Sequence, residues 1–341
     1  MAKGELLRKL FISYAKGDPD LFRSAALEII ADEENKNNRA LASALRRSLG
    51  NGSNLGTSPT LQPIPRKLEV VPHEKDKQLP LVDFVTPERR SSDIVLSREN
   101  QQLLLSVLDE FRQRDLIKSH GLRLRSKLLF CGPPGCGKTL CAEVFAHEIR
   151  LPLLVANMDT LISSFLGETA SNLRKVFDYA ADRPVVLLLD EFDAIARLRD
   201  DESQHGELKR VVNSLLQLID RFSGAGFLIA ATNHERQLDA AIWRRFDEVV
   251  YFAKPDRSQI GRLLQLKFRN FKTEFDPVSK AASLSGFSHA EIERVCLNAI
   301  RRSILQKRSS VDEVRFQQAI ELESRRRSIA NQIEGSSKAS K

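Results

Sequence analysis

A glycine-rich signature of the form Gly-x-x-x-x-Gly-Lys-Thr constrains this 341-residue chain more than any other feature. It occupies residues 132–139, directly after the apolar run 128–131 and before an apolar segment with helical character. Glycines let such a backbone curl so that its N–H groups and the N-terminus of the next helix face an anion. The lysine then reaches the β- and γ-phosphates, and the threonine binds Mg²⁺. The expected nucleotide-binding residues are Gly132, Pro133, Pro134, Gly135, Cys136, Gly137, Lys138, Thr139 and Leu140.

An acidic pair closes a second apolar run, residues 184–189. We expect Asp190 to end a strand that lies beside the strand of the phosphate loop, where its carboxylate and the Thr139 hydroxyl would hold Mg²⁺. Glu191 is the candidate to polarise the attacking water. Strand ends are commonly polar, so each acid alone would carry little information. Together with the phosphate loop, the pair predicts a site that binds nucleotide phosphates and hydrolyses them.

Short apolar strands alternate with helical patterns from about residue 93. This alternation predicts an α/β fold, a P-loop nucleotide-hydrolase core with a five-stranded parallel sheet between helices. The expected strands are residues 127–131, 152–156, 185–190, 227–231 and 249–252. Helical patterns then replace strands, at residues 257–271, 277–284, 289–306 and 312–325. We therefore expect the α/β domain at 93–254, a helical lid at 255–327 and a disordered tail at 328–341.

The first 92 residues divide into a helical part and a part rich in helix breakers. Apolar residues recur at helical spacing, and Gly17-Asp18-Pro19 ends one helix and begins another, which predicts a bundle of three short helices at 1–49. The first part of the segment 50–92 is rich in glycine, serine, asparagine and proline, as expected of a flexible linker. Two roles stay open for the bundle: docking of clients or partners, and stabilisation without a binding role.

Charge and cysteine content leave several partner classes open. Lys and Arg outnumber Asp and Glu by 53 to 45, and the net charge of +8 permits contact with nucleic acid, acidic protein tails or anionic lipid. The arginine-rich stretches could equally be solvated helix faces. The four cysteines are expected to be reduced thiols, and Cys136 lies where a helix N-terminus could lower its pKa. The N-terminus does not resemble a signal peptide and no run is long enough to cross a bilayer, so we expect a cytoplasmic protein without a membrane partner.

Further motifs resemble those of a known family. Residues 190–196, Asp-Glu-Phe-Asp-Ala-Ile-Ala, closely resemble the second nucleotide motif of the AAA+ ATPases, specifically of the narrower AAA clade. Residues 231–233 look like sensor 1, residues 238–247 resemble the second region of homology, and residues 286–292 resemble the lid motif. The resemblance covers about residues 93–325. It implies an ATPase that uses ATP and Mg²⁺.

The resemblance also implies roles for individual residues. Asn233 would orient the lytic water from a strand beside the phosphate loop. Arg244 and Arg245 would act in trans on the γ-phosphate held by the next subunit, which requires a ring or a spiral. Gly286 and Ala290 would line the base or the ribose of the nucleotide.

This chain departs from the family pattern at two points, and it lacks a motif of one related group. Its paired arginines are adjacent, as in the katanin and spastin group, whereas two residues separate them in many AAA members. His289 replaces the common glycine of the lid motif. The acidic motif has the same residues as in the membrane-anchored AAA metalloproteases, but the zinc-binding motif His-Glu-x-x-His of those enzymes is missing. The sequence has three His-Glu pairs, at residues 73–74, 147–148 and 234–235. The position of the second histidine is taken in each case by another residue, namely Lys77, Leu151 and Leu238. Any proteolysis would therefore need a separately encoded protease.

A short aromatic stretch suggests how the hydrolysis would be used. Phe165, Leu166 and Gly167 fall where AAA proteins carry a pore loop, in which Phe165 would grip a polypeptide and Leu166 would support it. Alternatively, Phe165 is simply buried under the sheet. The leading hypothesis is a hexameric protein unfoldase or remodeller that threads a polypeptide client through its pore. The alternative is an ATP-switched nucleic-acid-binding module, such as a helicase or transposase loader.

Overall fold

The computed structural model describes residues 24, 26–28, 30–31, 72–73, 80–163, 166–193, 205–223, 225–234 and 240–339. The chain divides into two compact units, Met1–Pro63 and Ile64–Lys341. The described residues of the first unit are helical, and the rest of the bundle expected at 1–49 lies outside the described part. The sheet, its covering helices and the helices that follow them all belong to the second unit.

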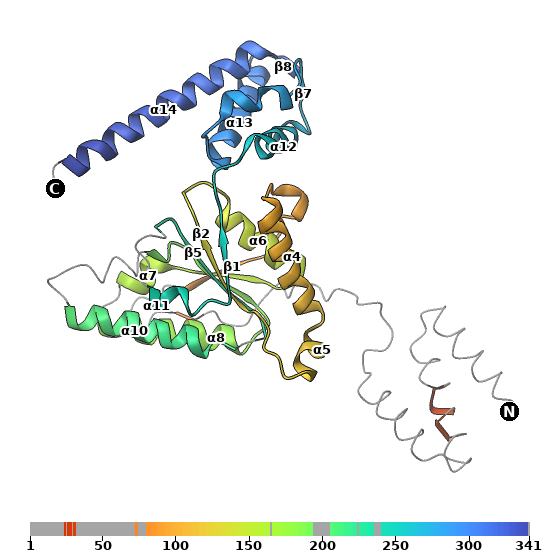
Figure 1. The fold of residues 1–341 in the computed structure, drawn as a ribbon, viewed down its shortest axis with the longest axis vertical. Coiled ribbons are helices and arrows are strands. Elements are labelled where there is room, and N and C mark those ends of the chain that lie inside the picture. Colours follow the sequence, from red (N-terminus) through yellow and green to blue (C-terminus); the bar gives the residue numbers. More distant parts are fainter. Residues whose placement is uncertain are drawn as a thin grey trace. The chain divides into compact units, whose positions relative to one another are not determined.

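Six strands of the described chain form one sheet at the centre of the second unit (Figure 1). Its parallel part has the order β3 (Leu153–Ala156), β4 (Val186–Leu189), β5 (Phe227–Thr232), β2 (Lys127–Cys131) and β6 (Glu248–Tyr251). The α/β fold and the five parallel strands expected from the sequence are thereby confirmed.

The number of strands is a correction, because β1 (Val82–Val85) adds a sixth at the edge of the sheet. It runs antiparallel to β3, with Val82 opposite Ala156. It lies within the segment 50–92 that the sequence predicts as a linker. Asp83 interrupts the apolar residues of this short edge strand, Val-Asp-Phe-Val, so they form no continuous run like those of the buried strands.

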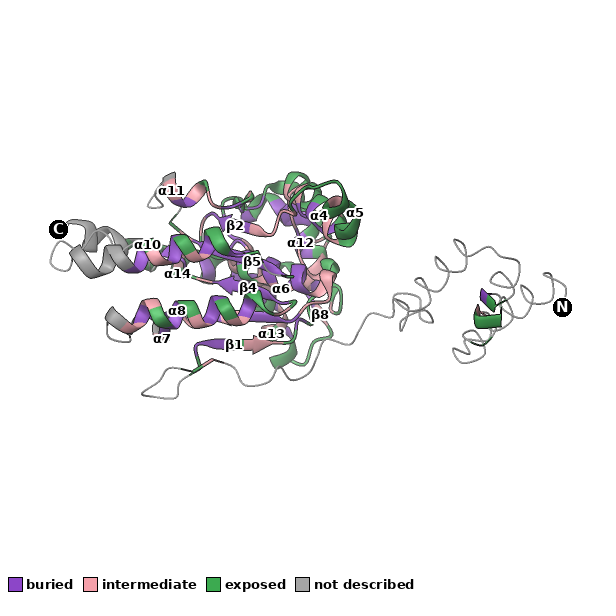
Figure 2. Cartoon of the chain, turned by 90° about the horizontal axis from the view of Figure 1, so that it is seen from below, coloured by how far each residue is buried: buried purple, intermediate pink, exposed green. Residues whose placement is uncertain are grey.

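Helices cover both faces of the sheet. They are α4 (Arg98–Arg112), α6 (Lys138–Ile149), α7 (Met158–Ser163), α8 (Leu166–Ala181), α10 (His205–Arg221) and α11 (Ala240–Trp243). α4 and α6 pack on one face together with Phe130, and α8 and α10 pack on the other together with Leu129 (Figure 1). Figure 2 shows β4 and β5 in purple, whereas the outward faces of α8 and α10 are green. Burial on both faces explains why these strands read as continuous apolar runs.

The helical lid after residue 255 has an apolar core of its own. Its helices are α12 (Arg257–Phe268), a 3₁₀ helix (Val278–Leu284), α13 (His289–Leu305) and α14 (Glu313–Ala339). Capping boxes begin α12, at Asp256 with Gln259, and α13, at Ser288 with Glu291. A short parallel pair of strands, β7 (Lys272–Thr273) and β8 (Ser310–Val311), was not expected from the sequence.

The structure of the C-terminal segment also differs from the expectation. The sequence predicts a disordered tail from residue 328, but α14 is helical as far as Ala339. The polar composition of this segment suggested disorder, yet extending a helix that is already formed at Glu313 costs far less than nucleating a new one. Among the described residues, no helix is long and apolar enough to cross a membrane.

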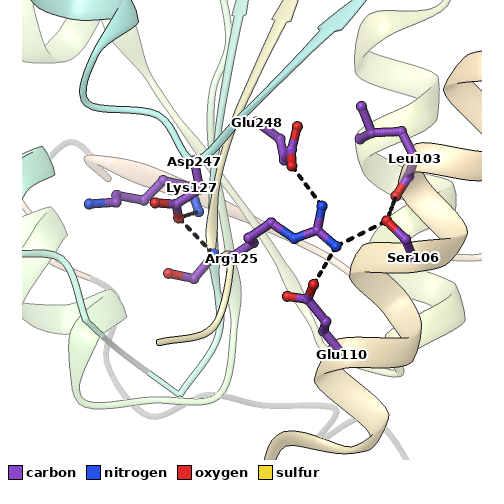
Figure 3. A network of polar contacts seen from close by, with 8 residues as sticks. Leu103, Ser106, Glu110, Arg125, Lys127, Asp247 and Glu248 are labelled. Carbon is purple, nitrogen blue, oxygen red and sulfur yellow. Dashed lines mark hydrogen bonds and ion pairs between the residues drawn. The ribbon is translucent and has the colours of Figure 1, made fainter. Parts of the chain in front are cut away.

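A polar network joins the amino ends of β2 and β6 to α4 (Figure 3). Arg125 Nη1 lies 2.6 Å from Glu248 Oε1, and Arg125 Nη2 donates to Ser106 Oγ at 3.0 Å. The same guanidinium pairs with Glu110. One arginine therefore fixes α4 and the start of β6 relative to the segment that leads into β2.

Asp247 strengthens this junction. Its Oδ2 accepts the backbone N–H groups of Ser126 and Lys127, each at 2.9 Å. Because Asp247 follows Arg244 and Arg245 by only a few residues, the junction also limits where these two arginines can lie.

Gly226 allows the close approach of two chain segments at the amino ends of β4 and β5. A Cβ at Gly226 would lie 1.7 Å from the carbonyl oxygen of Val185. We expect Gly226→Ala to force the two segments apart and to lower the free energy of unfolding by about 3 kcal/mol, measured by urea denaturation. Gly121→Ala is the control, because Gly121 has a φ of +73° but no atom within 4 Å of the added Cβ. It should cost about 1 kcal/mol, and equal losses in the two variants would contradict the steric account.

Candidate functional site

The phosphate loop lies at the carboxyl ends of the parallel strands, between β2 and α6. Gly137 is the N-cap of α6 with a φ of +94°, a conformation that favours glycine. Gly135 has a φ of +72°, and a Cβ there would lie 3.1 Å from both Ala290 Cβ and Ser288 Oγ. The N–H of Ala290 donates to the carbonyl oxygen of Gly135 at 2.9 Å. The start of α13 therefore rests directly on the phosphate loop.

The side chains of Lys138 and Thr139, at the start of α6, are both engaged. Lys138 Nζ is buried and donates to the carbonyl oxygens of Gly132 at 2.7 Å and Pro133 at 3.0 Å. Thr139 Oγ1 donates to Asp190 Oδ2 at 2.7 Å. A hydroxyl and a carboxylate oxygen are donors of the kind that Mg²⁺ prefers, so this pair could hold the ion expected from the sequence.

The strand that precedes Asp190 does not have the place in the sheet that the sequence predicts. β4 does not lie beside β2, because β5 lies between them. Asp190 and Thr139 meet because both follow the carboxyl ends of their strands, and Thr139 projects from the first turn of α6 over the end of β5. The order of strands depends on long-range pairing, which the local sequence pattern does not carry.

Glu191 and Asn233 lie at the same edge, after β4 and β5. Glu191 has a φ of +51°, which is uncommon for a residue other than glycine, and its side chain is exposed. Asp193 is only 4% exposed and accepts hydrogen bonds from Thr232 Oγ1 at 3.2 Å and from the N–H of Asn233 at 3.4 Å. Asp193 thus joins the ends of two strands. The sequence alone indicated no role for Asp193, although this residue belongs to the acidic motif at 190–196.

One cavity of about 360 Å³ brings most of the predicted residues together. The phosphate loop and the strand ends contribute Pro134, Gly135, Cys136, Gly137, Lys138, Thr139, Leu140, Asp190, Glu191 and Asn233. The segment ahead of α4 and the lid contribute Asp93, Ile94, Val95, Leu263, Lys267, His289, Ala290 and Glu293. Of this second group the sequence predicted only Ala290. The others come from segments whose approach depends on how the lid folds.

Gly286 is the predicted nucleotide-contacting residue of the lid that is not found in the wall of this cavity. Its φ is +80°, and its carbonyl oxygen accepts a hydrogen bond from Lys254 Nζ at 3.1 Å. In the described structure Gly286 therefore shapes the turn ahead of α13, and its contact with the nucleotide stays a prediction.

Burial sets the protonation of two side chains beside the phosphate loop. It raises the pKa of the Cys136 thiol, so the lowering of this pKa by the helix N-terminus, which the sequence suggested, does not prevail. Burial also lowers the pKa of His289, and this effect exceeds the opposite effect of the Val95 backbone beside it. Both side chains therefore favour the neutral form, and neither adds charge to the cavity.

The two arginines expected to act in trans lie outside this cavity. Arg244 and Arg245 follow α11, and the side chain of Arg244 is exposed. Arg245 Nε lies 3.0 Å from Asp220 Oδ2, at the end of α10. The next residue, Phe246, packs edge-on against Phe192 with ring centroids 6.3 Å apart. This contact anchors the arginine segment beside the carboxyl end of β4.

The predicted pore loop is only partly described. Phe165 is not among the described residues. Leu166 and Gly167 form the first turn of α8. The gripping role of this stretch therefore stays a prediction.

Comparison with known proteins agrees with this geometry. Residues 128–254 match the family model named "ATPase family associated with various cellular activities (AAA)". An uncharacterized AAA family ATPase of Sinorhizobium fredii is 52% identical over 327 residues, which make up 96% of this chain and 97% of that protein.

Two larger relatives match this chain over a part of their length. The peroxisomal ATPase PEX6 of Komagataella pastoris is 32% identical over 224 residues, 62% of this chain and 19% of PEX6. The ATP-dependent zinc metalloprotease FtsH of Mycoplasmopsis synoviae is 30% identical over 247 residues, 70% of this chain and 37% of FtsH. The phosphate loop, the acidic pair after β4 and the almost full-length match to the Sinorhizobium protein lead to one conclusion: the chain belongs to the AAA family of ATPases.

Proposed function

We propose that this chain binds ATP with Mg²⁺ and hydrolyses it as one subunit of a hexameric ring. The observation that carries the proposal is the division of the site. The phosphate loop, Asp190, Glu191 and Asn233 line one cavity, whereas Arg244 and Arg245 lie outside it. An exposed arginine outside the site of its own chain is suited to complete the site of a neighbouring copy.

The residues in the cavity fit the chemistry of phosphoryl transfer to water. The oxygens of Thr139 and Asp190 would hold Mg²⁺, which neutralises phosphate charge when bound. The N-terminus of α6 and Lys138 would bind the phosphates, and Lys138 would exchange its two carbonyl partners for phosphate oxygens. Glu191 would take a proton from the attacking water, and Asn233 would orient that water. Asp193 would keep Asn233 in register with Glu191 through its hydrogen bonds to the end of β5.

We further propose that the ring works in the cytoplasm and uses this hydrolysis to unfold or remodel a polypeptide client that it draws through a central pore. The FtsH relative is by its name an ATP-dependent protease, which supports a polypeptide as the client. The predicted pore loop at Phe165, Leu166 and Gly167 supports the same interpretation. Since the zinc motif of such proteases is missing from this sequence, proteolysis of the client would fall to a separate protease.

The action of the arginines in trans can be tested by mixing inactive subunits. Arg244→Ala and Arg245→Ala should each keep ATP affinity within about twofold and lower hydrolysis by at least about 1,000-fold. Adding Glu191→Gln or Lys138→Ala subunits, which are inactive but carry intact arginines, should restore phosphate release from Arg244→Ala. Arg326→Ala, an exposed arginine of α14, is the control and should stay active. Failure to recover activity with either donor, at every mixing ratio, would contradict the proposed division of the site.

The nature of the client can be tested by trapping it. Glu191→Gln should bind ATP without hydrolysing it, keep the ring assembled and retain its client, which is then identified after cross-linking and purification. Captured proteins would support the unfoldase, and Phe165→Ala in the same background should release them without loss of ATP binding. Nucleic acid as the captured species, with DNA-stimulated hydrolysis that survives Phe165→Ala, would instead establish the nucleic-acid-binding alternative.

A further inference from the structure

A cavity of about 920 Å³ lies at the amino ends of the strands, at the edge of the sheet away from the phosphate loop. Its walls come from α5 (Arg114–Ser119), the segment that leads into β2, the end of α10 and the start of β5. Figure 1 shows α5 at the end of the sheet remote from the lid. The described lining shares no residue with the nucleotide cavity, and the proposed hydrolysis gives it no role.

Positive charge dominates the lining of this cavity. Its cationic residues are Arg114, Lys118, Arg123, Lys127 and Arg221. None of these side chains forms an ion pair with another residue of the described chain. In Figure 3 the side chain of Lys127 runs away from the Arg125 network. These cations therefore face the cavity or solvent without being held in an ion pair of the described chain.

The two acidic residues in the lining offset only part of this positive charge, because they stand against five cations and Asp220 already has a cationic partner. Asp220 Oδ2 lies 3.0 Å from Arg245 Nε. Asp247 Oδ2 accepts two backbone N–H groups at the start of β2. The cavity thus offers an excess of positive charge to an anionic ligand.

The floor of the cavity is apolar, and its composition favours a polypeptide over nucleic acid. Leu122 is 60% exposed and could contact an apolar side chain of a ligand. The aromatic rings, in contrast, are already engaged: Phe111 packs against Phe227 at 5.2 Å between centroids, and Arg114 lies over Phe111 at 5.2 Å. Phe222 is only 4% exposed. No ring of this lining presents an open face on which a nucleotide base could stack, as binding of single-stranded nucleic acid requires.

We propose that this cavity is a docking site for an acidic segment of a partner protein, in which aspartate or glutamate side chains alternate with apolar ones. The acidic side chains pair with the cations of α5 and of the segment before β2, and the apolar side chains cover Leu122 and the floor around it. This partner binds the chain at the edge of the sheet opposite to the nucleotide and does not need ATP to do so.

The test is direct binding of a labelled Glu- and Leu-rich peptide to the full chain, followed by fluorescence anisotropy. Lys118→Glu/Arg123→Glu should weaken binding by at least about tenfold. Arg221→Glu, on a different element, should weaken it as well. The control is Arg325→Glu/Arg326→Glu on α14, which makes the same change of charge outside the cavity and should alter binding by less than about twofold. Unchanged thermal unfolding and ATP affinity would show that each variant is folded.

Two further measurements complete the test: the binding of peptides with altered composition, and the oligomeric state of the cavity variants. Peptides with Gln for Glu, or with Ser for Leu, should each lose binding, because the cavity needs both charge and apolar contact. Equal losses in the cavity and α14 variants would overturn the proposal in favour of unspecific attraction. Tighter binding of duplex DNA that the cavity variants abolish would assign the surface to nucleic acid. Dissociation of the assembly by the cavity variants, with peptide affinity unchanged, would instead make it a contact between copies of this chain.

Discussion

The shared carboxyl edge of β4, β5 and β2 is the constraint on which the nucleotide site depends. Neighbouring strands lie about 4.8 Å apart, so β4 and β2, with β5 between them, are separated by about 10 Å. The hydrogen bond of 2.7 Å between Thr139 and Asp190 can form only because the phosphate loop carries Thr139 across the end of β5. Asp193 holds the ends of β4 and β5 together from the buried side. The fully buried apolar strands therefore position the nucleotide site, because they fix the polar residues that follow their carboxyl ends.

The lid is linked to the same edge through a second set of contacts. The N–H of Ala290 donates to Gly135, and the close approach of Ser288 and Ala290, together with a φ of +72°, disfavours a larger residue at Gly135. Val95 packs into the apolar core of the lid while lining the nucleotide cavity. A ligand in this cavity would thus touch the lid, the phosphate loop and the segment ahead of α4 at once. Binding would in this way be coupled to the position of the lid.

Much of this arrangement could be predicted from the sequence, because it depends on local patterns. The phosphate loop has a fixed spacing, and the buried strands read as apolar runs between helical segments. β1 was missed because a short edge strand with Asp83 lacks such a run. The helical end of α14 was missed because its polar residues resemble a disordered tail. The place of β5 between β4 and β2, and the approach of Leu263, Lys267 and His289 to the cavity, arise from long-range packing that no local pattern encodes.

One chain alone is expected to hold only part of a working site, since Arg244 and Arg245 lie outside the cavity that contains Glu191. The most direct test is the rate of ATP hydrolysis per subunit across a dilution series, with the oligomeric state measured in the same samples. The rate should fall in step with the loss of the assembled ring and return on concentration. Full activity in samples that contain only monomer would contradict the account.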